Sequence, residues 1–485
     1  MAIVTFLLAG FIYWLVPTEL EQAPIMAVIV VVMAMCWIFE LLPIPVTSLL
    51  PLILFPVFGI LDAKSTASFY GKDMIFLFLG GMILAKALQV SNLHKRIALH
   101  ILNIIGTEPG KLVLGFMITT GFLSMWISNT SSVIVMMPIA ISIIEQIKHN
   151  HQDDKQVSKL AVSLMLAIAY SADIGGMATL IGTPPNMVFM EMYHTTFPEL
   201  SKVSFTQWMM LGLPISIVFL FTGWLLLSKV IFRMPKYKLF ESKQIIKNEI
   251  KQLGKIKQDE LMAGVVFGLA ILLWLTGADI TISDNHTIKG WRSLFDLKMV
   301  TDASIAIGTA SLLFMIPSKR RKKETLLKWE DLKDLPWGIL FLFGGGFALA
   351  GGFESSGLST VIGNLFNHVN ISSPIILVIV VCLVLTFLTE ITSNTATTNL
   401  VLPILAKASV VLGVDPRILM IPATLSASCA FMMPVASPTQ AIIFGSGYVK
   451  IKQMVRAGIL FNFLGIIVVT FVFYLLAEFV LGINI

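Results

Sequence analysis

Long apolar runs, separated by short polar or basic segments, make up most of this chain. A helix needs about 20 predominantly apolar residues to cross the hydrocarbon core of a bilayer, so these runs predict membrane-spanning helices. The run at the amino terminus has neither a basic start nor a small-residue cleavage site, and we predict a first span there rather than a signal peptide. The predicted spans cover residues 2–16, 24–39, 43–60, 160–190, 203–231, 261–277, a stretch ending near 316, 418–445 and 458–480. The span at 160–190 is expected to be interrupted at Gly175-Gly176 and at 182–186, and the span at 418–445 at 434–440.

Two further apolar segments contain paired glycines. Residues 74–90 hold Gly80 and Gly81, are short for a crossing, and are followed by basic residues. Residues 337–358 contain a similar glycine cluster. We predict a re-entrant helical hairpin in each of these two segments.

Two other segments are too long for one straight crossing, and each carries a polar triplet. Residues 111–146 contain Ser128-Asn129-Thr130, and residues 374–411 contain Ser393-Asn394-Thr395. In each segment the triplet is expected to separate two half-helices.

The triplets belong to an internal duplication. They are offset by 393 − 128 = 265 residues, and the glycine-containing segments match at the same offset, because Phe76 aligns with Phe341 (341 − 76 = 265). Two matches at one offset indicate a repeat. An odd number of predicted spans lies between the two predicted hairpins, which would invert the second repeat relative to the first. The expected fold is therefore an all-α polytopic membrane protein with about eleven transmembrane helices plus two re-entrant hairpins in two inverted repeats.

Composition and charge agree with a membrane protein. The chain is 56% hydrophobic and 13% charged, against roughly 45–50% and about 25% in soluble domains. The net charge of +6 comes largely from basic loops at 233–257, 319–323 and 450–456, so it indicates topology rather than nucleic-acid binding. Placing these loops in the cytoplasm puts the amino terminus inside and the carboxyl terminus outside. Residues 233–257 are also expected to lie on the membrane surface as an amphipathic helix.

The polar triplets predict a binding site. Unsatisfied backbone groups in hydrocarbon cost several kcal/mol each, so a broken helix persists only where it lines a cavity inside the protein. Half-helix N-termini suit an anion, and carbonyl groups at opposing ends suit a small cation. A single triplet would fit interhelical packing alone. The duplicated triplets instead predict a ligand with an anionic group at each end.

Other classes of protein fit this sequence less well. A membrane-embedded hydrolase would need a nucleophile with a base, or a metal motif, and the sequence shows neither, so we expect no enzyme and no cofactor. A channel would need a ring of charges or a carbonyl filter. Glu390 and Asp173 are intramembrane carboxylates and hence functional candidates, although Glu390 fits a structural hydrogen-bonding role as well.

Several motifs together resemble the divalent anion/sodium symporter family, which includes INDY-type dicarboxylate and citrate carriers. These motifs are the two Ser-Asn-Thr triplets, the stretches at 182–186 and 431–436, and the glycine segment at 344–350. The resemblance covers nearly the whole chain. It implies an elevator-type transporter, a homodimer in the cytoplasmic membrane, and a substrate such as succinate, malate, fumarate or 2-oxoglutarate. It also implies two domains, with residues 1–60 and 203–335 forming a scaffold and residues 61–202 and 336–485 forming a moving transport domain.

Site residues follow from the resemblance, motif by motif. The substrate would be held by Asn129, Thr130, Thr183, Asn394, Thr395, Ser437 and Pro438. One sodium site would use Ser124, Ser128, Asn129 and Gly182, and its symmetry mate would use Thr389, Ser393, Asn394 and Ala436.

Three departures from the family pattern leave the coupling open. Pro438-Thr439-Gln440 replaces a second Pro-Pro-Asn, Asp173 stands where Asn is usual, and Lys86 replaces an apolar residue. A buried dianion needs compensating positive charge. Sodium would supply that charge in a symporter, whereas a lysine at the site would favour sodium-independent exchange. Lys86 would equally be accommodated by reaching the interface, so sodium-coupled symport is our prediction and exchange is the alternative.

Overall fold

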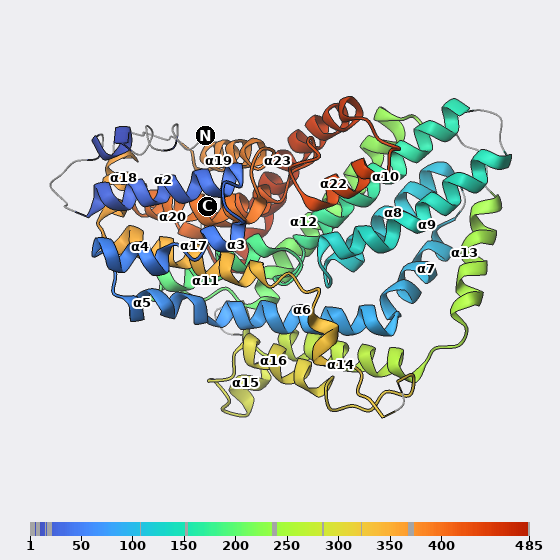
Figure 1. Cartoon of the computed structure of the whole chain (residues 1–485), viewed down its shortest axis with the longest axis horizontal. Helices are drawn as coiled ribbons and strands as arrows, with labels where there is room; N and C mark the ends of the chain where they lie inside the picture. The colour runs from blue at the N-terminus through green and yellow to red at the C-terminus, as the bar shows by residue number, and fades with distance from the viewer. Residues whose placement is uncertain are drawn as a thin grey trace.

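The described part of the chain is an assembly of helices with one small β-hairpin (Figure 1). The computed structural model describes residues 5, 10–14, 16, 22–106, 108–150, 154–234, 240–283, 286–321, 323–366 and 373–483. The predicted span at residues 2–16 therefore lies largely outside the described residues. In chain order the helices are α2 (Ala23–Phe39), α3 (Ile44–Thr47), α4 (Pro51–Phe58), α5 (Ala63–Ser68), α6 (Asp73–Ser91), α7 (Leu93–Ile105), α8 (Pro109–Ser124), α9 (Asn129–Asn150), α10 (Asp154–Gly176), α11 (Pro184–Thr196), α12 (Phe205–Leu225), α13 (Phe240–Leu253), α14 (Gln258–Leu275), α15 (Trp291–Leu294), α16 (Asp302–Leu312), α17 (Gly338–Ser355), α18 (Leu358–Phe366), α19 (Pro374–Leu388), α20 (Asn394–Val411), α21 (Pro416–Ala427), α22 (Pro438–Gly445) and α23 (Ile451–Leu481).

The all-helical membrane class is confirmed. Seven described helical segments are long and apolar enough to cross a bilayer, and the predicted spans at 203–231, 261–277 and 458–480 are among them as α12, α14 and α23. The predicted span at 24–39 is the shorter apolar helix α2. The total of about eleven transmembrane helices stays a prediction.

The predicted single span at 43–60 is wrong in detail, because it forms two short helices. α3 ends at Thr47 and α4 begins at Pro51. Proline has no backbone N–H to donate, so it fits the first turn of a new helix better than the interior of a continuous one.

The hairpin predicted at residues 74–90 is also wrong, because α6 runs through Gly80 and Gly81 without interruption. Glycine costs only about 1 kcal/mol relative to alanine in a helix, which close packing can offset. A Cβ atom on Gly80 would lie 2.6 Å from the backbone carbonyl carbon of Ala306. These glycines therefore let α16 pack closely against α6.

The second predicted hairpin, at residues 337–358, is wrong for the same reason. α17 is one helix that passes through the glycine cluster. A Cβ atom on Gly345 would lie 2.5 Å from the carbonyl oxygen of Ser48, and one on Gly346 would lie 2.0 Å from Oδ1 of Asn399. The cluster allows α3 and α20 to approach α17 on two sides.

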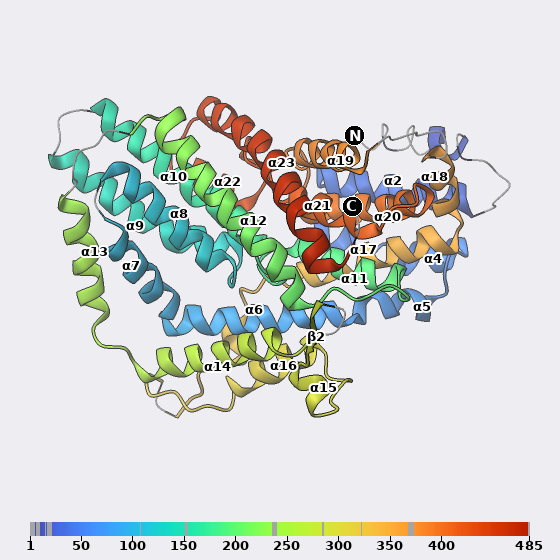
Figure 2. The ribbon, with the colours of Figure 1, turned by 180° about the vertical axis from the view of Figure 1, so that it is seen from behind.

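The re-entrant hairpins lie instead at the two polar triplets. α8 ends at Ser124 and α9 begins at Asn129, and both arms pack against α10. In the second half α19 ends at Leu388 and α20 begins at Asn394, and both pack against α21. The predicted breaks are confirmed, but the chain doubles back at each of them. The two hairpins extend from the middle of the molecule toward opposite ends (Figures 1 and 2).

A second interruption follows each hairpin, as the sequence predicted. The chain is unwound between the end of α10 at Gly176 and the start of α11 at Pro184. It is unwound again between Ala427 and Pro438, which separate α21 from α22. Each half of the molecule therefore supplies a hairpin tip and an unwound segment.

The amphipathic helix predicted at 233–257 forms as α13, which packs against α7 and α9. Ile245 and Ile246 are buried, whereas Lys247 and Lys251 are exposed. Arg96 anchors the following turn by donating hydrogen bonds to Glu260 at 2.6 Å and to the carbonyl oxygen of Gly254 at 2.9 Å. The apolar face of α13 thus packs on the protein itself.

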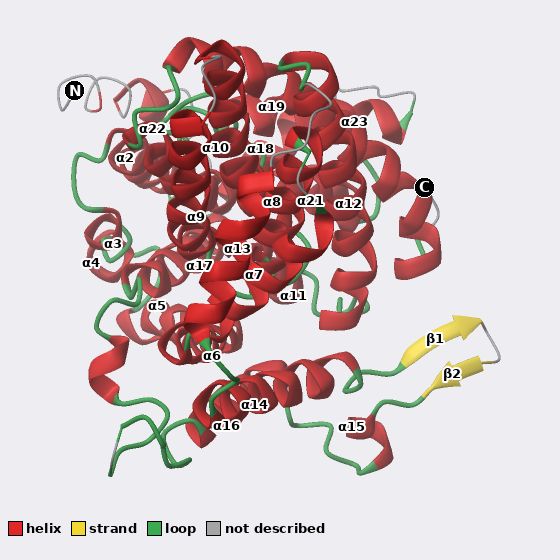
Figure 3. Cartoon of the chain, turned by 90° about the vertical axis from the view of Figure 1, so that its right-hand side faces the viewer, coloured by secondary structure: helices red, strands yellow, loops and turns green. Residues whose placement is uncertain are grey.

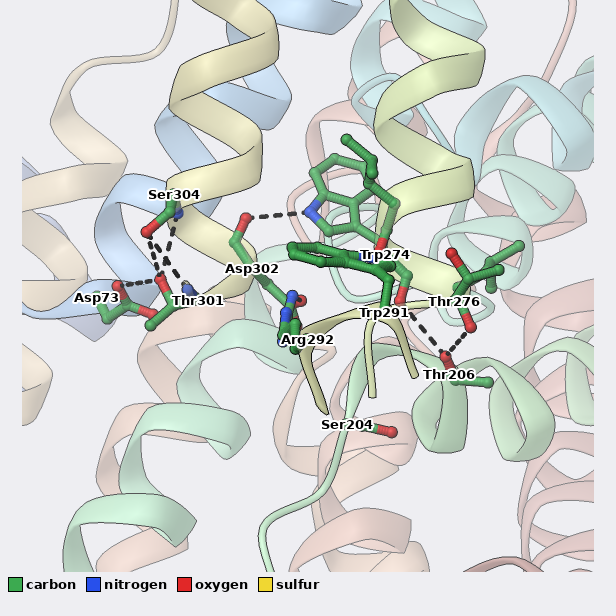
Figure 4. A network of polar contacts seen from close by, with 12 residues as sticks. Asp73, Ser204, Thr206, Trp274, Thr276, Trp291, Arg292, Thr301, Asp302 and Ser304 are labelled. Carbon is green, nitrogen blue, oxygen red and sulfur yellow. Dashed lines mark hydrogen bonds and ion pairs between the residues drawn. The ribbon is translucent and has the colours of Figure 1, made fainter. Parts of the chain in front are cut away.

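At one edge, β1 (Ile280–Ser283) and β2 (His286–Ile288) form a protruding hairpin (Figure 3). A polar network next to it joins α14 to α16 (Figure 4). Trp274 donates to the carbonyl oxygen of Asp302 at 3.0 Å, Arg292 pairs with the Asp302 carboxylate, and Thr301 donates to Asp73 at 2.9 Å. The network ties the start of α6 to these two helices.

Candidate binding site at the hairpin tips

Four helix N-termini meet at one cavity between the two halves. α9 begins at Asn129, α11 at Pro184, α20 at Asn394 and α22 at Pro438, and all four residues line a cavity of about 1100 Å³. A helix N-terminus carries a partial positive charge and free backbone donors. Because four of them converge, the cavity is suited to an anion.

At the first hairpin tip, the side-chain amide of Asn129 is held from both sides. Ser124 Oγ donates to Asn129 Oδ1 at 2.8 Å, and Asn129 Nδ2 donates to Asp173 Oδ1 at 3.1 Å. Ser124 and Asp173 are buried, and Asn129 borders the cavity. Since an amide oxygen has two lone pairs, Asn129 Oδ1 can accept one further partner.

A small cradle lined by oxygen atoms lies next to Asn129. A Cβ atom on Gly176 would lie 2.6 Å from Asn129 Oδ1 and 3.2 Å from the carbonyl oxygen of Gly182. Any side chain larger than hydrogen would therefore fill this space. Oxygen atoms are the ligands that hard cations prefer. Ser124, Asn129 and Gly182, which are three of the predicted sodium ligands, are thus close together and suited to a small cation.

The second hairpin tip repeats this arrangement. Thr389 Oγ1 lies 2.7 Å from Asn394 Oδ1 and 2.8 Å from the carbonyl oxygen of Ala427. The Thr389 hydroxyl has one hydrogen and can donate it to only one of these two oxygens. The other oxygen keeps a lone pair free for a cation. Ala436, another predicted ligand, is buried and borders the same cavity.

The other predicted site residues also border the cavity: Ser128, Thr130, Thr183, Ser393, Thr395, Ser437 and Pro438. The Ser128 hydroxyl, however, donates to Ser131 Oγ at 2.9 Å and accepts from the Ser131 N–H at 3.3 Å. Its side chain therefore caps the first turn of α9 rather than facing Ser124. The structure brings the predicted residues together, and their roles in binding stay predictions.

Glu390 organises the unwound segment between α21 and α22. Its carboxylate accepts hydrogen bonds from the backbone N–H groups of Phe431, Met432 and Met433 at 2.8–3.1 Å, and from Asn462 Nδ2 at 2.7 Å. The unwound chain leaves these N–H groups without helical partners, so a buried carboxylate satisfies them. The structural hydrogen-bonding role considered for Glu390 is confirmed.

Asp173 connects the two halves, which the sequence did not predict. Besides Asn129, it accepts hydrogen bonds from Thr439 Oγ1 at 2.9 Å, Gln440 Nε2 at 3.4 Å and Ser437 Oγ at 3.5 Å. The sequence indicates Asp173 both as an intramembrane functional candidate and as a departure from the family pattern, and the Thr439-Gln440 pair as a departure only. The chemistry of these residues could have predicted the contact, because the Asp173 carboxylate accepts hydrogen bonds and Thr439 and Gln440 can donate them.

Lys86 and Asp334 also border the cavity. Lys86 Nζ lies 3.6 Å from Asp334 Oδ2, and the Asp334 side chain is 88% exposed, so the cavity reaches the surface here. Arg320 donates to the carbonyl oxygen of Val90 at 3.2 Å, which places this residue of the basic 319–323 stretch at the same end of α6. Nearby, the hydrogen-bonded Arg321 guanidinium holds the pKa of Asp331 below its ordinary value.

Curated relatives share much of this sequence. A protein of Staphylococcus saprophyticus named "Sodium-dependent dicarboxylate transporter SdcS" is 44% identical over 453 residues, which cover 93% of this chain and 85% of the relative. The protein of the same name from Staphylococcus aureus strain MRSA252 matches with the same identity and coverage.

Solved structures share the fold at low sequence identity. YdaH, a transporter of Alcanivorax borkumensis, has a TM-score of 0.59 at 13% identity, covering 87% of this chain and 90% of YdaH. MtrF of Neisseria gonorrhoeae, described among antimetabolite efflux pumps, has a TM-score of 0.56 at 14% identity, covering 87% and 82%. These similarities concern the fold alone.

Family membership follows from the sequence match together with the site. Residues 1–481 match the family described as "Sodium:sulfate symporter transmembrane region". This match and the curated relatives confirm the resemblance that the duplicated triplets indicated. The chain therefore belongs to the sodium:sulfate symporter family, the divalent anion/sodium symporters.

Proposed function

We propose that this chain is a sodium-coupled symporter that carries C4 and C5 dicarboxylates, such as succinate, malate, fumarate and 2-oxoglutarate, across the cytoplasmic membrane. The observation that carries the proposal is the convergence of two opposed hairpin tips, each with an asparagine, on one cavity. Two relatives that are 44% identical over most of the chain are named sodium-dependent dicarboxylate transporters, which supports this substrate and this ion.

In this proposal each hairpin tip binds one carboxylate of the substrate. Asn129 and Thr130 act at one tip and Asn394 and Thr395 at the other, with the unwound segments completing the site. Backbone N–H groups at the helix N-termini stabilise the negative charge of each carboxylate. A ligand with two carboxylates engages both repeats at once, whereas a monocarboxylate engages one, so the pair of tips selects for dicarboxylates.

Sodium ions supply the compensating charge. A dianion in a site of low dielectric is costly unless it is paired. One sodium site lies beside Ser124, Asn129 and Gly182, and the other beside Thr389, Asn394 and Ala436. Because ions and substrate stabilise one another, we expect them to bind and to be released together, so that the sodium gradient drives uptake.

Sodium-independent exchange, with Lys86 in place of a cation, is less well supported. Lys86 has Asp334 as a neighbour at 3.6 Å, so its positive charge is already partly compensated. The sodium dependence in the relatives' names also favours symport.

We further propose that the cavity opens to the cytoplasm, because Asp334 and Arg320 of the basic 319–323 stretch lie near the same end of α6. The proposal includes an inside amino terminus, a homodimer, and an elevator cycle in which residues 61–202 and 336–485 move against the rest. The opposed hairpins suit such a cycle, since both belong to the part that would move as a unit.

Ligand-induced stabilisation of purified protein tests the proposed binding site. A ligand that binds only the folded state raises the free energy of unfolding by roughly 2.7 kcal/mol at a hundredfold excess over Kd. The midpoint of thermal unfolding rises as a result. We expect succinate to raise the midpoint in sodium chloride and to have little effect in potassium or choline chloride. Equal effects of succinate in all three salts would argue against sodium coupling, and acetate serves as the monocarboxylate control.

A further inference from the structure

Asp173 is a buried carboxylate with hydrogen-bond donors on two sides. It is 1% exposed and lies in the last turn of α10. Of the residues that the structure describes, no lysine, arginine or histidine pairs with it, and all of its donors are neutral amides or hydroxyls. A buried carboxylate needs such donors, and in turn it fixes how each of them is oriented.

The orientation that matters most is that of the Asn129 amide. Asp173 Oδ1 accepts the hydrogen bond of Asn129 Nδ2 at 3.1 Å, so the Nδ2 side of the amide faces Asp173. The Oδ1 atom is therefore turned toward Ser124 and the cradle at Gly176. Without the carboxylate the amide could turn over and present its N–H groups to a cation.

On its other side Asp173 binds the second repeat. Thr439 Oγ1 lies within hydrogen-bonding distance of both carboxylate oxygens, at 2.9 and 3.1 Å. Thr439 stands in the first turn of α22, directly after Pro438, and its hydroxyl also lies 2.6 Å from Ser437 Oγ. The Asp173 carboxylate thus joins the first proposed sodium site to the substrate-binding segment of the opposite half.

The link is present in one repeat only. The residues that precede α11 and α22 are Thr183 and Ser437, which differ by 437 − 183 = 254 positions. Counted back from these residues, the counterpart of Asp173 is residue 173 + 254 = 427, which is Ala427. Counted from the helix ends Gly176 and Ala427, it is 173 + 251 = 424, which is Thr424, and neither residue has a carboxylate. The two proposed sodium sites therefore differ in how they are connected to the substrate.

We propose that Asp173 is a positioning residue that orients the Asn129 amide so that its Oδ1 atom faces the first sodium site. The same carboxylate couples that site to the substrate-binding segment around Ser437. This inference rests on the proposed sodium-coupled transport. Sodium at the first site and a dicarboxylate in the cavity stabilise the same arrangement of Asn129, Asp173 and Thr439. Each ligand therefore raises the affinity for the other by the same factor.

Two variants separate the two sides of this link. Asp173→Ala removes the acceptor for the Asn129 amide, whereas Thr439→Val removes the hydroxyl on the substrate side and leaves that contact in place. Ser163→Ala, in the same helix, is the matched control, because the Ser163 hydroxyl is buried and has no hydrogen-bond partner in the described structure. The measurements are sodium-dependent thermal stabilisation without substrate, and succinate uptake at low and saturating sodium.

For Asp173→Ala we expect the half-saturating sodium concentration to rise roughly 10- to 100-fold in both assays, as for partners that orient metal ligands. The KM for succinate should return to near the wild-type value at saturating sodium. For Thr439→Val we expect unchanged stabilisation by sodium alone, a raised KM for succinate, and a smaller change in that KM between low and high sodium.

Several results would overturn the inference. An Asp173→Ala protein with a half-saturating sodium concentration within about twofold of wild type would overturn it, because a partner that orients a metal ligand should have a larger effect. If Asp173→Ala is not recovered as a monodisperse protein, Thr439→Val decides, and an unchanged dependence of succinate KM on sodium rejects the link. Wild-type protein without any sodium-driven uptake would instead overturn the proposed function.

Discussion

Oγ1 of Thr389 lies 2.7 Å from Oδ1 of Asn394. The same relationship exists in the first half, where Ser124 Oγ lies 2.8 Å from Asn129 Oδ1, and both members of the pair are displaced by 265 residues (389 − 124 and 394 − 129). In each hairpin a buried hydroxyl at the end of one arm fixes the amide that begins the next. The duplication in the sequence thus repeats one structural arrangement, a hydroxyl hydrogen-bonded to the asparagine amide at the hairpin tip.

Replacing either asparagine should abolish transport. Asn129→Ala and Asn394→Ala each remove an amide that we assign to a carboxylate and to a sodium ion. We expect succinate uptake at physiological sodium to fall at least tenfold in either variant, while the protein remains monodisperse. Ser163→Ala is the control and should keep wild-type uptake. Near-normal uptake by both asparagine variants would show that the two hairpin tips do not bind the substrate.

Glu390→Gln should lower stability. The Glu390 carboxylate accepts hydrogen bonds from three successive backbone N–H groups and from Asn462, whereas a glutamine amide has one acceptor oxygen and an NH₂ group that would face these donors. Hydrogen bonds to a charged group contribute about 1.5–3 kcal/mol each, so we expect a clear drop in the unfolding midpoint.

The control for this variant is Glu354→Gln, because Glu354 is exposed at the end of α17. Its unfolding midpoint should match that of wild type. Equal midpoints for Glu390→Gln and wild type would show that the unwound segment does not depend on the carboxylate.

Gly80→Ala should destabilise the contact between α6 and α16. A Cβ atom at this position would lie 2.6 Å from the backbone of Ala306, and forcing an extra carbon into a packed interface costs about 1–3 kcal/mol. Gly308→Ala, on α16, is the matched control, since no atom lies within 4 Å of its added Cβ. The control should be neutral or slightly stabilising, and equal thermal midpoints for the two variants would contradict this view of the interface.

A cysteine at position 89 should report which side of the membrane the cavity opens to. Gln89 borders the cavity near its mouth, and the three described native cysteines are buried. We expect Gln89→Cys to react with a membrane-impermeant maleimide from the cytoplasmic side, and Lys64→Cys, on α5, to react from the outside. Labelling of Gln89→Cys only from the outside would contradict the proposal that the cavity opens to the cytoplasm.

The sequence predicted the chemistry of the site better than the path of the chain. Segment length located the polar triplets, and glycine and proline residues inside an apolar run located the interruptions at Gly176 and Pro184. The glycines at 80–81 were mistaken for breaks, because the sequence does not show that Ala306 would pack against them. The link from Asp173 to Thr439 also remained hidden, since it joins residues 266 positions apart.

Uptake of labelled succinate into proteoliposomes tests the central claim most directly. Vesicles that contain no substrate are given succinate outside, with either an inward sodium gradient or equal potassium, and a second set is preloaded with succinate. Sodium-coupled symport predicts accumulation in the empty vesicles under the sodium gradient and almost none in potassium. Uptake confined to preloaded vesicles and indifferent to sodium would contradict it, and would identify an exchanger instead.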